Sequence, residues 1–368
     1  MTAPLSHINY GMFIMPFHSP DKPLAQGYDE DLELVVRAEE LGFDEFWIGE
    51  HHTMVYENIA MPEIFIGAAL RETGNIRLGP APVCLQQHHP ALVASRLSFL
   101  DHLSRGRLNL CFGPGSVPTD LEILGVDPQH SAAMVAESIE MILTLWQTDP
   151  PFAIDGRFWE IHMERTIDPE VGLGVIHKPY QRPHPPISMP ISSIHSETAR
   201  EAGRRGFQPF GHSLIPSNTL ANIWTTYAQA ALEAGRMPDR CDFKIARAIF
   251  LADSTEEAVR RARSNTVAAN FTYIGSLLKR GGRGLGMFKR DPDMPDADCN
   301  LDYLMGEQII AGDVDTVVDR LESLRTEVGD FGTLVMMSYD WDDKDSWLRS
   351  LELFATELMP ALNREERP

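Results

Sequence analysis

Hydrophobic positions along the chain alternate between short apolar runs and stretches with helical spacing. Residues 7–16 and 43–48 are apolar runs typical of strands, and residues 29–41 between them carry apolar side chains at helical spacing before Gly42, a natural C-cap. The same alternation predicts helices over 62–71, 90–103 and 131–146 and strands over 76–83 and 108–113. A repeated strand–helix pattern of this kind predicts a parallel sheet.

The alternation breaks at residues 149–186, which are rich in proline. Within this stretch, Asp155-Gly156 lies at the centre of residues 152–160 and predicts a hairpin turn. The pattern then resumes with strands expected over 187–192, 207–210, 243–252 and 332–338, and with helices over 197–204, 218–234, 314–324 and 347–359. Another helix is expected to start at the capping box of Ser254, and the last helix is expected to stop at Pro360.

These elements predict an α/β fold, a (β/α)8 TIM barrel with insertions. Its length of 368 residues suits one barrel domain over 1–368 with an insertion at about 149–186. Residues 272–300 are rich in glycine and charge, which favours a mobile lid or a linker.

Composition excludes several classes of function. The formal net charge of −21 repels phosphate backbones and anionic lipids, so neither a nucleic acid nor a membrane is an expected partner. The four cysteines are widely spaced without a CxxC pair, which gives no sign of a disulfide framework or a zinc site. The first residues lack the pattern of a signal peptide, and no apolar run is long enough to cross a membrane, so we expect a cytoplasmic protein.

The richest chemistry follows the second expected strand, where Glu50, His51 and His52 stand together. Active sites of TIM barrels lie at the carboxyl ends of the strands. Because neighbouring residues of an extended chain point to opposite faces, at most one imidazole should face the barrel axis. Either histidine alone is equally consistent with a structural role. We expect no metal, since two histidine ligands on one face of a strand need His-x-His spacing.

Two further strand ends carry unusual backbone. Pro80-Ala81-Pro82 ends the third strand, and it predicts either a simple strand end at Gly79 or a bulge or cis Ala81–Pro82 bond that lets the backbone approach a flat ligand. Gly113 and Gly115 end the fourth strand, where glycines leave room and expose N–H groups.

Hydroxyl groups gather at the end of the fifth expected strand. Ser192, Ser193, Ser196 and Thr198 surround the start of a helix, which predicts either a phosphate site or ordinary N-capping by Ser196. Apolar side chains near other strand ends suit an apolar substrate pocket, although each could equally belong to the core. The candidates for this pocket are Phe13, Met15 and Trp47.

Several of these stretches together resemble the bacterial luciferase-like flavin monooxygenase family. The resemblance covers nearly the whole chain, and within the family the chain is similar to the diketocamphane and limonene monooxygenases. The most specific stretches are residues 38–52, 100–107 and 311–317, which read AEELGFDEFWIGEHH, LDHLSRGR and AGDVDTV. The resemblance implies a two-component enzyme that takes reduced FMN from a separate flavin reductase. It implies reaction with O2 through a flavin C4a-(hydro)peroxide and oxidation of a small apolar substrate such as a terpene, a cyclic ketone or an alkyl compound.

The resemblance also implies roles for residues. His51 matches the catalytic histidine of the family, Glu50 and the Ala81–Pro82 backbone match positions beside the flavin ring, and Ser196 and Thr198 match the phosphate site. With Ser192, Ser193, Gly113 and Gly115, these form the expected FMN site. Luciferase has a reactive cysteine followed by an arginine where this chain has Gly113 and Pro114, so aldehyde luminescence chemistry is not implied.

The resemblance further implies a homodimer formed through the second and third helices, with residues 64–66 and 92–97 as candidate contacts. Two other functions stay open. One is a deazaflavin-dependent oxidoreductase on the same barrel, and the other is a non-catalytic flavin-binding protein, which Glu50 and His51 disfavour. Whether oxygen enters as an ester, an epoxide or a hydroxyl is also open.

Overall fold

The computed structural model describes residues 7–282 and 284–363. The chain forms two compact units: unit 1 comprises Met1–Phe46 and Met189–Pro368, and unit 2 comprises Trp47–Ser188. Both boundaries fall inside strands, so β2 (Glu45–Ile48) and β8 (Ile187–Ile191) contribute to both units. The expected single domain over 1–368 stays a prediction.

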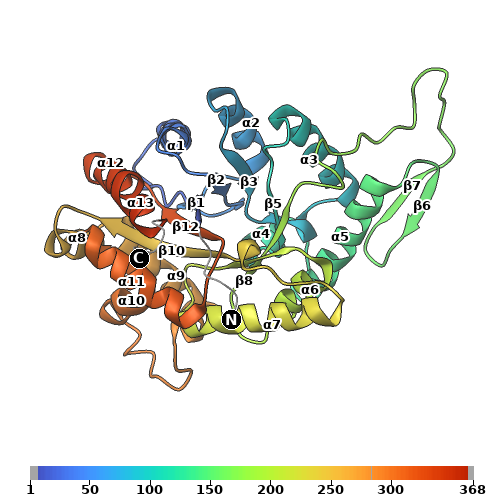
Figure 1. Cartoon of the computed structure of the whole chain (residues 1–368). Helices are drawn as coiled ribbons and strands as arrows, with labels where there is room; N and C mark the ends of the chain where they lie inside the picture. Colours follow the sequence, from blue (N-terminus) through green and yellow to red (C-terminus); the bar gives the residue numbers. More distant parts are fainter. Residues whose placement is uncertain (1–6, 283, 364–368) are drawn as a thin grey trace. The chain divides into compact units, whose positions relative to one another are not determined.

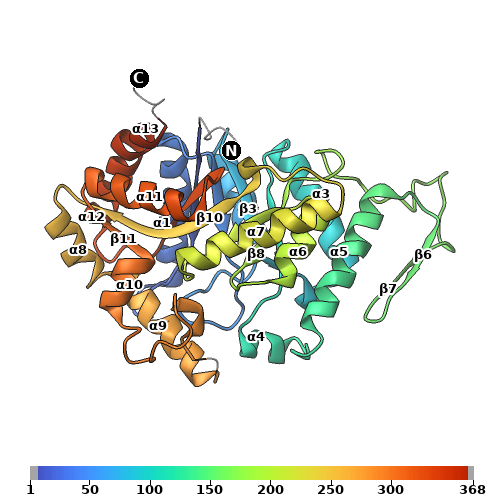
Figure 2. The ribbon, with the colours of Figure 1, turned by 60° about the horizontal axis from the view of Figure 1, so that its bottom comes forward.

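Unit 1 holds the first strand and the later strands and helices (Figures 1 and 2). Its elements, besides its parts of β2 and β8, are β1 (Asn9–Ile14), α1 (Leu24–Glu40), α6 (Glu197–Arg205), β9 (Gln208–Gly211), α7 (Ser217–Glu233), β10 (Lys244–Leu251), α8 (Thr255–Ala262), α9 (Thr266–Arg280), α10 (Leu301–Glu307), β11 (Ile309–Gly312), α11 (Val314–Val328), β12 (Thr333–Ser338), α12 (Lys344–Leu353), a π-helical segment (Phe354–Leu358) and α13 (Met359–Leu362), with 3-10 turns at Arg240–Asp242 and Gly286–Phe288.

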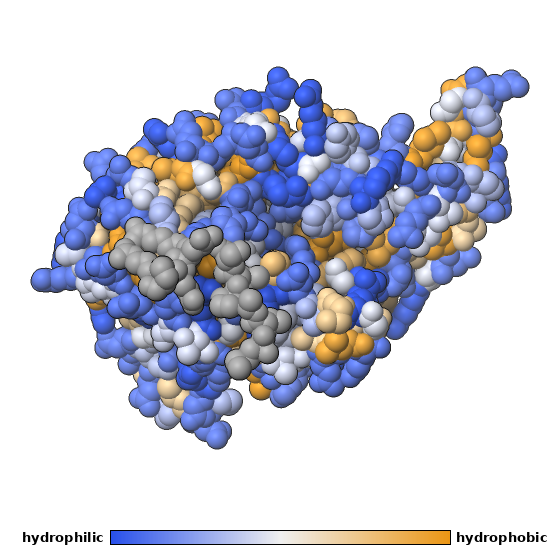
Figure 3. Space-filling view, viewed as in Figure 1, coloured by the Kyte–Doolittle hydropathy of each residue, from blue (hydrophilic) through white to orange (hydrophobic). Residues whose placement is uncertain are grey.

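Unit 2 holds the remaining elements. They are α2 (Pro62–Glu72), β3 (Arg77–Pro80), β4 (Val83–Cys84), a 3-10 turn (Leu85–Gln87), α3 (Pro90–Ser104), β5 (Leu110–Gly113), α4 (Pro118–Ile123), α5 (Ser131–Gln147), β6 (Phe152–Asp155) and β7 (Glu160–Met163). The hairpin of β6 and β7 and its return segment project away from α5 (Figure 1), and apolar surface lies along this projection (Figure 3).

The strands pair in a cyclic order. In unit 1 the order is β2-β1-β12-β10-β9-β8, with β11 on β10, and in unit 2 β3 follows β2 while β5 and β4 follow β8. The pairs β1–β12, β10–β12, β10–β9 and β5–β8 are parallel. A parallel bridge between Leu78 and Leu108 then joins the chain of β3 to the residues before β5. This α/β order is the one expected for a (β/α)8 barrel, which confirms the predicted fold class.

Most predicted elements are confirmed, including the hairpin at Asp155-Gly156 and the Ser254 cap, whose side chain accepts from the Glu257 N–H. The expectation that Pro360 stops the last helix is wrong. Pro360 lies in the first turn of α13, where a missing N–H removes no helical hydrogen bond. The pattern also missed α4, α10 and β11, which are short, and α9, which follows α8 after only residues 263–265.

The segment expected to form a lid is partly helical and partly packed. It begins within α9, and Leu285 and Phe288 are buried, the latter beside the Phe271 ring. Lys289 and Asp296 form an ion pair of 2.6 Å, and Arg283 lies outside the described residues. The mobility of this segment stays a prediction. Among residues 7–282 and 284–363, every helix is too short or too polar to cross a membrane.

Candidate active site

Strand β2 ends at Ile48, so the polar residues that follow it leave the sheet and turn into unit 2. The Glu50 carboxylate is buried. One oxygen accepts from Nε2 of His88 at 2.5 Å and from Nε2 of His52 at 3.3 Å, and the other accepts from the Cys84 N–H at 3.0 Å. Burial alone would raise the pKa of Glu50, but the two imidazoles and the Cys84 N–H lower it to about 2. Glu50 is therefore a fixed anion.

Glu50, His52 and His88 also form a group whose ligand atoms lie within 4.8 Å of one another, a set that could hold a metal ion. The surroundings of His88 favour a proton instead. Nη1 of Arg96 lies 3.4 Å from Nδ1 of His88, so a guanidinium donor faces that nitrogen and leaves Nε2 to donate to Glu50. A metal on Nε2 would require a hydrogen on Nδ1, directed at another donor. The absence of a metal stays a prediction.

His51 lies between two carboxyl groups. Its Nδ1 is 3.4 Å from Oδ2 of Asp120, and its Nε2 is 3.4 Å from Oε2 of Glu57. The side chain of His51 is 24% exposed, whereas those of Glu57 and Asp120 are 3% and 2% exposed. The imidazole is thus the member of this group that remains open to solvent.

The two carboxyl groups are held differently. Asp120, on α4, accepts from the His52 N–H at 3.2 Å and from the Thr53 hydroxyl at 2.5 Å. Glu57 lies in the irregular segment between β2 and α2, and among the described residues its Oε1 has no hydrogen-bond partner. We call Glu50, His51, His52, Glu57, His88 and Asp120 the β2 cluster.

The pKa values of the cluster follow from these contacts. Burial lowers the pKa of His51, but the hydrogen bond to Asp120 and the charges of Glu57, Asp120 and Glu50 outweigh it, so the net pKa is raised. Burial would raise the pKa of Asp120, yet His51, Thr53 and the His52 N–H lower it to about 2. The pKa of Glu57 is raised by burial, which the charge of His51 offsets only in part. A partly exposed imidazole with a raised pKa can donate a proton near neutral pH.

The backbone features expected beside a flat ligand are present in unit 2. The Ala81–Pro82 bond is cis, and the Ala81 N–H donates to the Ile48 carbonyl at 2.7 Å. Gly113 ends β5 opposite Cys84, and a Cβ on Gly115 would lie 2.9 Å from Sγ of Cys84. The backbone near residues 113–115 therefore lies directly against β4.

The hydroxyl residues lie in unit 1. Ser192 and Ser193 are exposed, and Ser196 is the N-cap residue of α6 without a side-chain capping hydrogen bond, so ordinary capping does not occupy its hydroxyl. Thr198 is in the first turn. His195 adopts a left-handed φ of 50°, and its N–H donates to Oδ1 of Asn222 at 2.7 Å, which fixes the turn before the helix.

The three predicted substrate contacts differ in exposure. Phe13 in unit 1 is partly exposed and its ring lies 6.5 Å from that of Phe210, while Met15 is 9% exposed. Trp47 in unit 2 is fully buried, and a Cβ on Gly79 would lie 2.6 Å from its ring, so only glycine admits the indole there. The roles of all three residues stay predictions.

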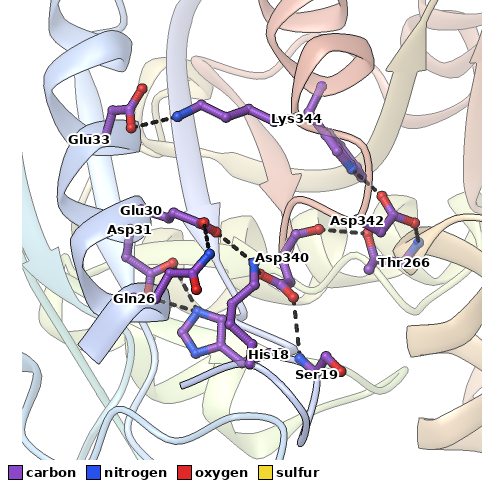
Figure 4. Close-up of polar contacts among 12 residues, drawn as sticks. His18, Ser19, Gln26, Glu30, Asp31, Glu33, Thr266, Asp340, Asp342 and Lys344 are labelled. Atoms are coloured by element: carbon purple, nitrogen blue, oxygen red, sulfur yellow. Dashed lines mark hydrogen bonds and ion pairs between the residues drawn. The ribbon is translucent and has the colours of Figure 1, made fainter. Parts of the chain in front are cut away.

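A second buried polar cluster lies in unit 1, at the ends of β1 and β12 (Figure 4). Nζ of Lys22 donates to Glu30 at 2.6 Å and to Asp340 at 2.5 Å, and Nε2 of His18 lies 3.2 Å from Asp31. His18, Asp31 and Asp340 are 1%, 5% and 6% exposed. We call these five residues the β12 cluster.

Sequence reasoning proposed Glu50 and His51 as site residues but did not name Glu57, His88 and Asp120, which contact them. The spacing argument considered only pairs of histidines, whereas Glu50 and His52 have the spacing that it required. His89, the neighbour of His88, is the N-cap residue of α3, and its side chain accepts from the Ala91 N–H. No nearby sequence pattern marks Glu57 or Asp120 as a site residue. Glu57 lies in the irregular segment between β2 and α2, and Asp120 lies on the short helix α4.

The family model described as luciferase-like monooxygenase matches residues 8–330. The chain belongs to this family. It is therefore a flavin-dependent monooxygenase, as predicted. The chain is 31% identical over 367 residues to 4-hydroxyprotoasukamycin monooxygenase of Streptomyces nodosus subsp. asukaensis, a match that covers 98% of this chain and 93% of that protein.

Two further relatives confirm the resemblance. Limonene 1,2-monooxygenase of Rhodococcus erythropolis is 28% identical over 375 residues, covering 100% of this chain and 90% of that protein. The solved structure of the oxygenating constituent of 3,6-diketocamphane monooxygenase from Pseudomonas putida, a type II Baeyer–Villiger monooxygenase in complex with FMN, matches with a TM-score of 0.87 at 28% identity. That match covers 96% of this chain and 98% of the other, and it supports the barrel fold.

Proposed function

We propose that the protein is the oxygenase component of a two-component, FMNH2-dependent monooxygenase that oxidises a small apolar organic substrate with O2. The observation that carries the proposal is the partly exposed His51 between Asp120 and Glu57, in a chain similar over 96% of its length to an FMN-bound monooxygenase. A flavin reductase would supply the reduced cofactor, and we propose a cytoplasmic location on that basis.

Each unit holds groups that suit one part of FMN. In unit 1, the Ser196 hydroxyl makes no capping hydrogen bond at the N-terminus of α6, and the exposed Ser192 and Ser193 precede it in the chain, which favours a phosphate. The cis Ala81–Pro82 bond and the backbone of residues 113–115 would lie beside the flavin ring. When bound, reduced FMN would supply the two electrons that activate O2, so that one oxygen atom of O2 enters the substrate and the other leaves as water.

The residues of the chain would serve that chemistry as follows. His51 would hold a proton near the reacting oxygen and give it up, a role worth roughly 10²–10⁴-fold in rate. Glu50 would fix the turn after β2 through its three hydrogen bonds. Phe13 and Met15 would contribute apolar surface for the substrate, for which we propose a terpene, a cyclic ketone or an alkyl compound.

The test is product analysis with the purified protein, FMN, a flavin reductase, NADH and ¹⁸O₂. The substrate panel should contain terpenes, cyclic ketones and aldehydes. One ¹⁸O atom in a product that requires both proteins supports the proposal. Hydride transfer from a reduced deazaflavin, without incorporation of oxygen, would overturn it in favour of a dehydrogenase. Tight FMN binding without turnover on any substrate would identify a flavin-binding protein.

We also propose a homodimer formed through α2 and α3. Of the residues first suggested, Phe65, Ile66, Val93 and Leu97 are buried within unit 2, whereas Ile64 and Leu92 are 74% and 65% exposed. Phe99 and Leu103 extend the exposed apolar face of α3, at 66% and 54%. An apolar stripe of this kind suits a second copy of the same face. Sedimentation at micromolar concentration should give a dimer, and Leu92→Glu with Phe99→Glu should give a monomer. A monomeric wild type would overturn the dimer.

A further inference from the structure

His51 presents a problem of proton counting. Each of its ring nitrogens faces a carboxyl oxygen at 3.4 Å, one from Asp120 and one from Glu57. A neutral imidazole carries one N–H and one lone pair. If both carboxyl groups were ionised and the imidazole neutral, a lone pair would face an anionic oxygen. That arrangement is repulsive and is not stable in a buried site.

Two arrangements remove the repulsion. Either His51 carries a proton on both nitrogens, or the carboxyl group of Glu57 carries one and donates it to the imidazole. In both, the Glu57–His51 pair holds one proton more than a neutral histidine beside a carboxylate would. The two groups titrate as a coupled pair, so this proton belongs to the pair rather than to one residue.

The surroundings distinguish the two carboxyl groups. Asp120 is an anchored anion, because the His52 N–H and the Thr53 hydroxyl both donate to it. Glu57 is buried in unit 2, and within the described part of the chain its Oε1 has no hydrogen-bond donor. An ionised carboxylate without donors is costly to bury, whereas a carboxylic acid tolerates such a place better. Glu57 is therefore the member of the group suited to gain and lose a proton.

The contacts of His51 are also loose. Charge-assisted N–H···O hydrogen bonds are normally about 2.7–2.9 Å long, and both contacts of His51 are 3.4 Å. The ring also keeps 24% of its side chain exposed. It can thus turn toward a ligand while Glu57 stays buried behind it, and catalytic hydrogen bonds are often long until a ligand is bound.

We propose that Glu57 is a positioning residue that stores a proton for His51. The inference rests on the proposed function, in which His51 gives up a proton at the reacting oxygen. The step starts from the arrangement in which Glu57 is protonated and Nε2 of His51 carries a lone pair. The Nδ1–H bond of His51 breaks and its proton passes to the reacting oxygen, while the O–H bond of Glu57 breaks and a new N–H bond forms at Nε2. The carboxylate left on Glu57 regains its proton from solvent before the next cycle. Glu57 itself does not touch the reacting atoms.

The charged groups that act on His51 come from several segments. They are Glu57 after β2, Asp120 on α4 and Glu50, with His52 and His88 bonded to Glu50. Glu57→Gln removes the carboxyl group and nearly preserves its shape. A neutral amide can neither stabilise the imidazolium nor give a proton to Nε2, so in this variant the extra proton of the pair has no second carrier and should be lost from His51 at lower pH. Glu63→Gln is a matched control, since Glu63 is a carboxylate of the same unit with a 10% exposed side chain and pairs with Arg96 at 2.9 Å.

The decisive experiment follows the histidine signals of the flavin-free protein by ¹⁵N and ¹³C NMR as a function of pH. The signal of His51 is assigned by its loss in His51→Gln. We expect its titration midpoint to fall in Glu57→Gln, to return toward wild type in Glu57→Asp, and to stay unchanged in Glu63→Gln. An unchanged midpoint in a folded Glu57→Gln protein overturns the proposal, as does an equal shift in Glu63→Gln.

A second readout links the stored proton to the reaction. Product formed per FMNH2 oxidised should be similar in wild type and Glu57→Gln near about pH 6, and should fall in the variant by up to about 10²-fold near about pH 8.5, above the ordinary histidine pKa of about 6.5. A parallel loss at both pH values would indicate a merely structural role and overturn the proposal. Since the NMR titration needs no flavin, its result stands even if the proposed oxygenation fails.

Discussion

The β2 cluster of unit 2 and the β12 cluster of unit 1 have similar composition and different construction. Each combines histidine with carboxylates at the ends of strands. In the β12 cluster, Lys22 contacts its two carboxylates at 2.5 and 2.6 Å, and His18 is 1% exposed. In the β2 cluster, His51 contacts its two carboxylates at 3.4 Å and its side chain keeps 24% of its exposure.

This difference is the one expected between a structural cluster and the reactive site that we propose. The short contacts of Lys22 join the loop after β1 to α1 and to the end of β12, so they stabilise one arrangement of the chain. The long contacts of His51 leave its protons available to a ligand. Buried charge alone therefore does not identify a site; the informative signs are exposure, loose geometry and an oxygen without a donor.

The largest expected effect comes from removing the reactive group. His51→Ala should keep FMN binding but lower product formed per FMNH2 oxidised by roughly 10²–10⁴-fold, because the proton donor is lost. Hydrogen peroxide should accumulate instead. His52→Ala is the matched control with the smaller effect, since its imidazole donates to Glu50 at 3.3 Å rather than facing Asp120 and Glu57. If His51→Ala formed as much product per FMNH2 oxidised as wild type, His51 would have only a structural role. The two clusters would then not differ in function.

An intermediate effect is expected from the β12 cluster. Lys22→Met leaves the buried Asp340 without its cation and should cost about 1.5–3 kcal/mol of unfolding free energy, the range for a hydrogen bond to a charged group. Urea denaturation measures this change, and the coupling of flavin oxidation to product should stay as in wild type. Lys344→Met removes a pair of 2.7 Å whose side chains are 43% and 38% exposed, and it should cost at most about 1 kcal/mol. Equal losses in the two variants would contradict the structural role of the β12 cluster.

The smallest expected effect is on the stability of the protein at acidic pH. The pKa of Glu50 falls from 4.5 to about 2 on folding, so the folded protein binds this proton less tightly than the unfolded chain does. The resulting stability is present above pH 4.5 and is lost as the pH falls toward about 2. In Glu50→Gln, unfolding free energy should depend less on pH within this window, as measured by urea titrations. If the unfolding free energy of Glu50→Gln depended on pH as steeply as that of wild type, the neighbours of Glu50 would not stabilise its carboxylate.

Much of the fold could be predicted because its signals are local. Apolar periodicity and residues such as Gly42 and Ser254 mark elements whose ends lie within a few residues of the prediction. The error at Pro360 has a local cause as well. A proline in the interior of a helix breaks it, whereas a proline in the first turn is tolerated. Here a π-helical segment ends at Leu358 and α13 begins at Met359, so Pro360 lies in a first turn.

The partners within the candidate site are not local. Asp120 accepts a hydrogen bond from the backbone N–H of His52, which is 68 residues away in the sequence. No sequence pattern relates two positions so far apart. The residue types of Ser192, Ser193 and Ser196 suggested either capping or phosphate, and only the backbone geometry shows that the hydroxyl of Ser196 makes no cap. Sequence could thus name the imidazole that the site is built around, but not the groups that set its protonation.

The boundaries of unit 2 have a consequence for how such proteins diversify. All members of the β2 cluster lie within the uninterrupted segment Trp47–Ser188, whereas the hydroxyls of residues 192–198 lie outside it. One crossover on each side of this segment would exchange the proposed acid–base groups as a set, with Glu57, Asp120 and His51 inherited together. Recombination between related genes would therefore replace the proposed proton donor and its partners as a module while the proposed phosphate-holding turn is retained.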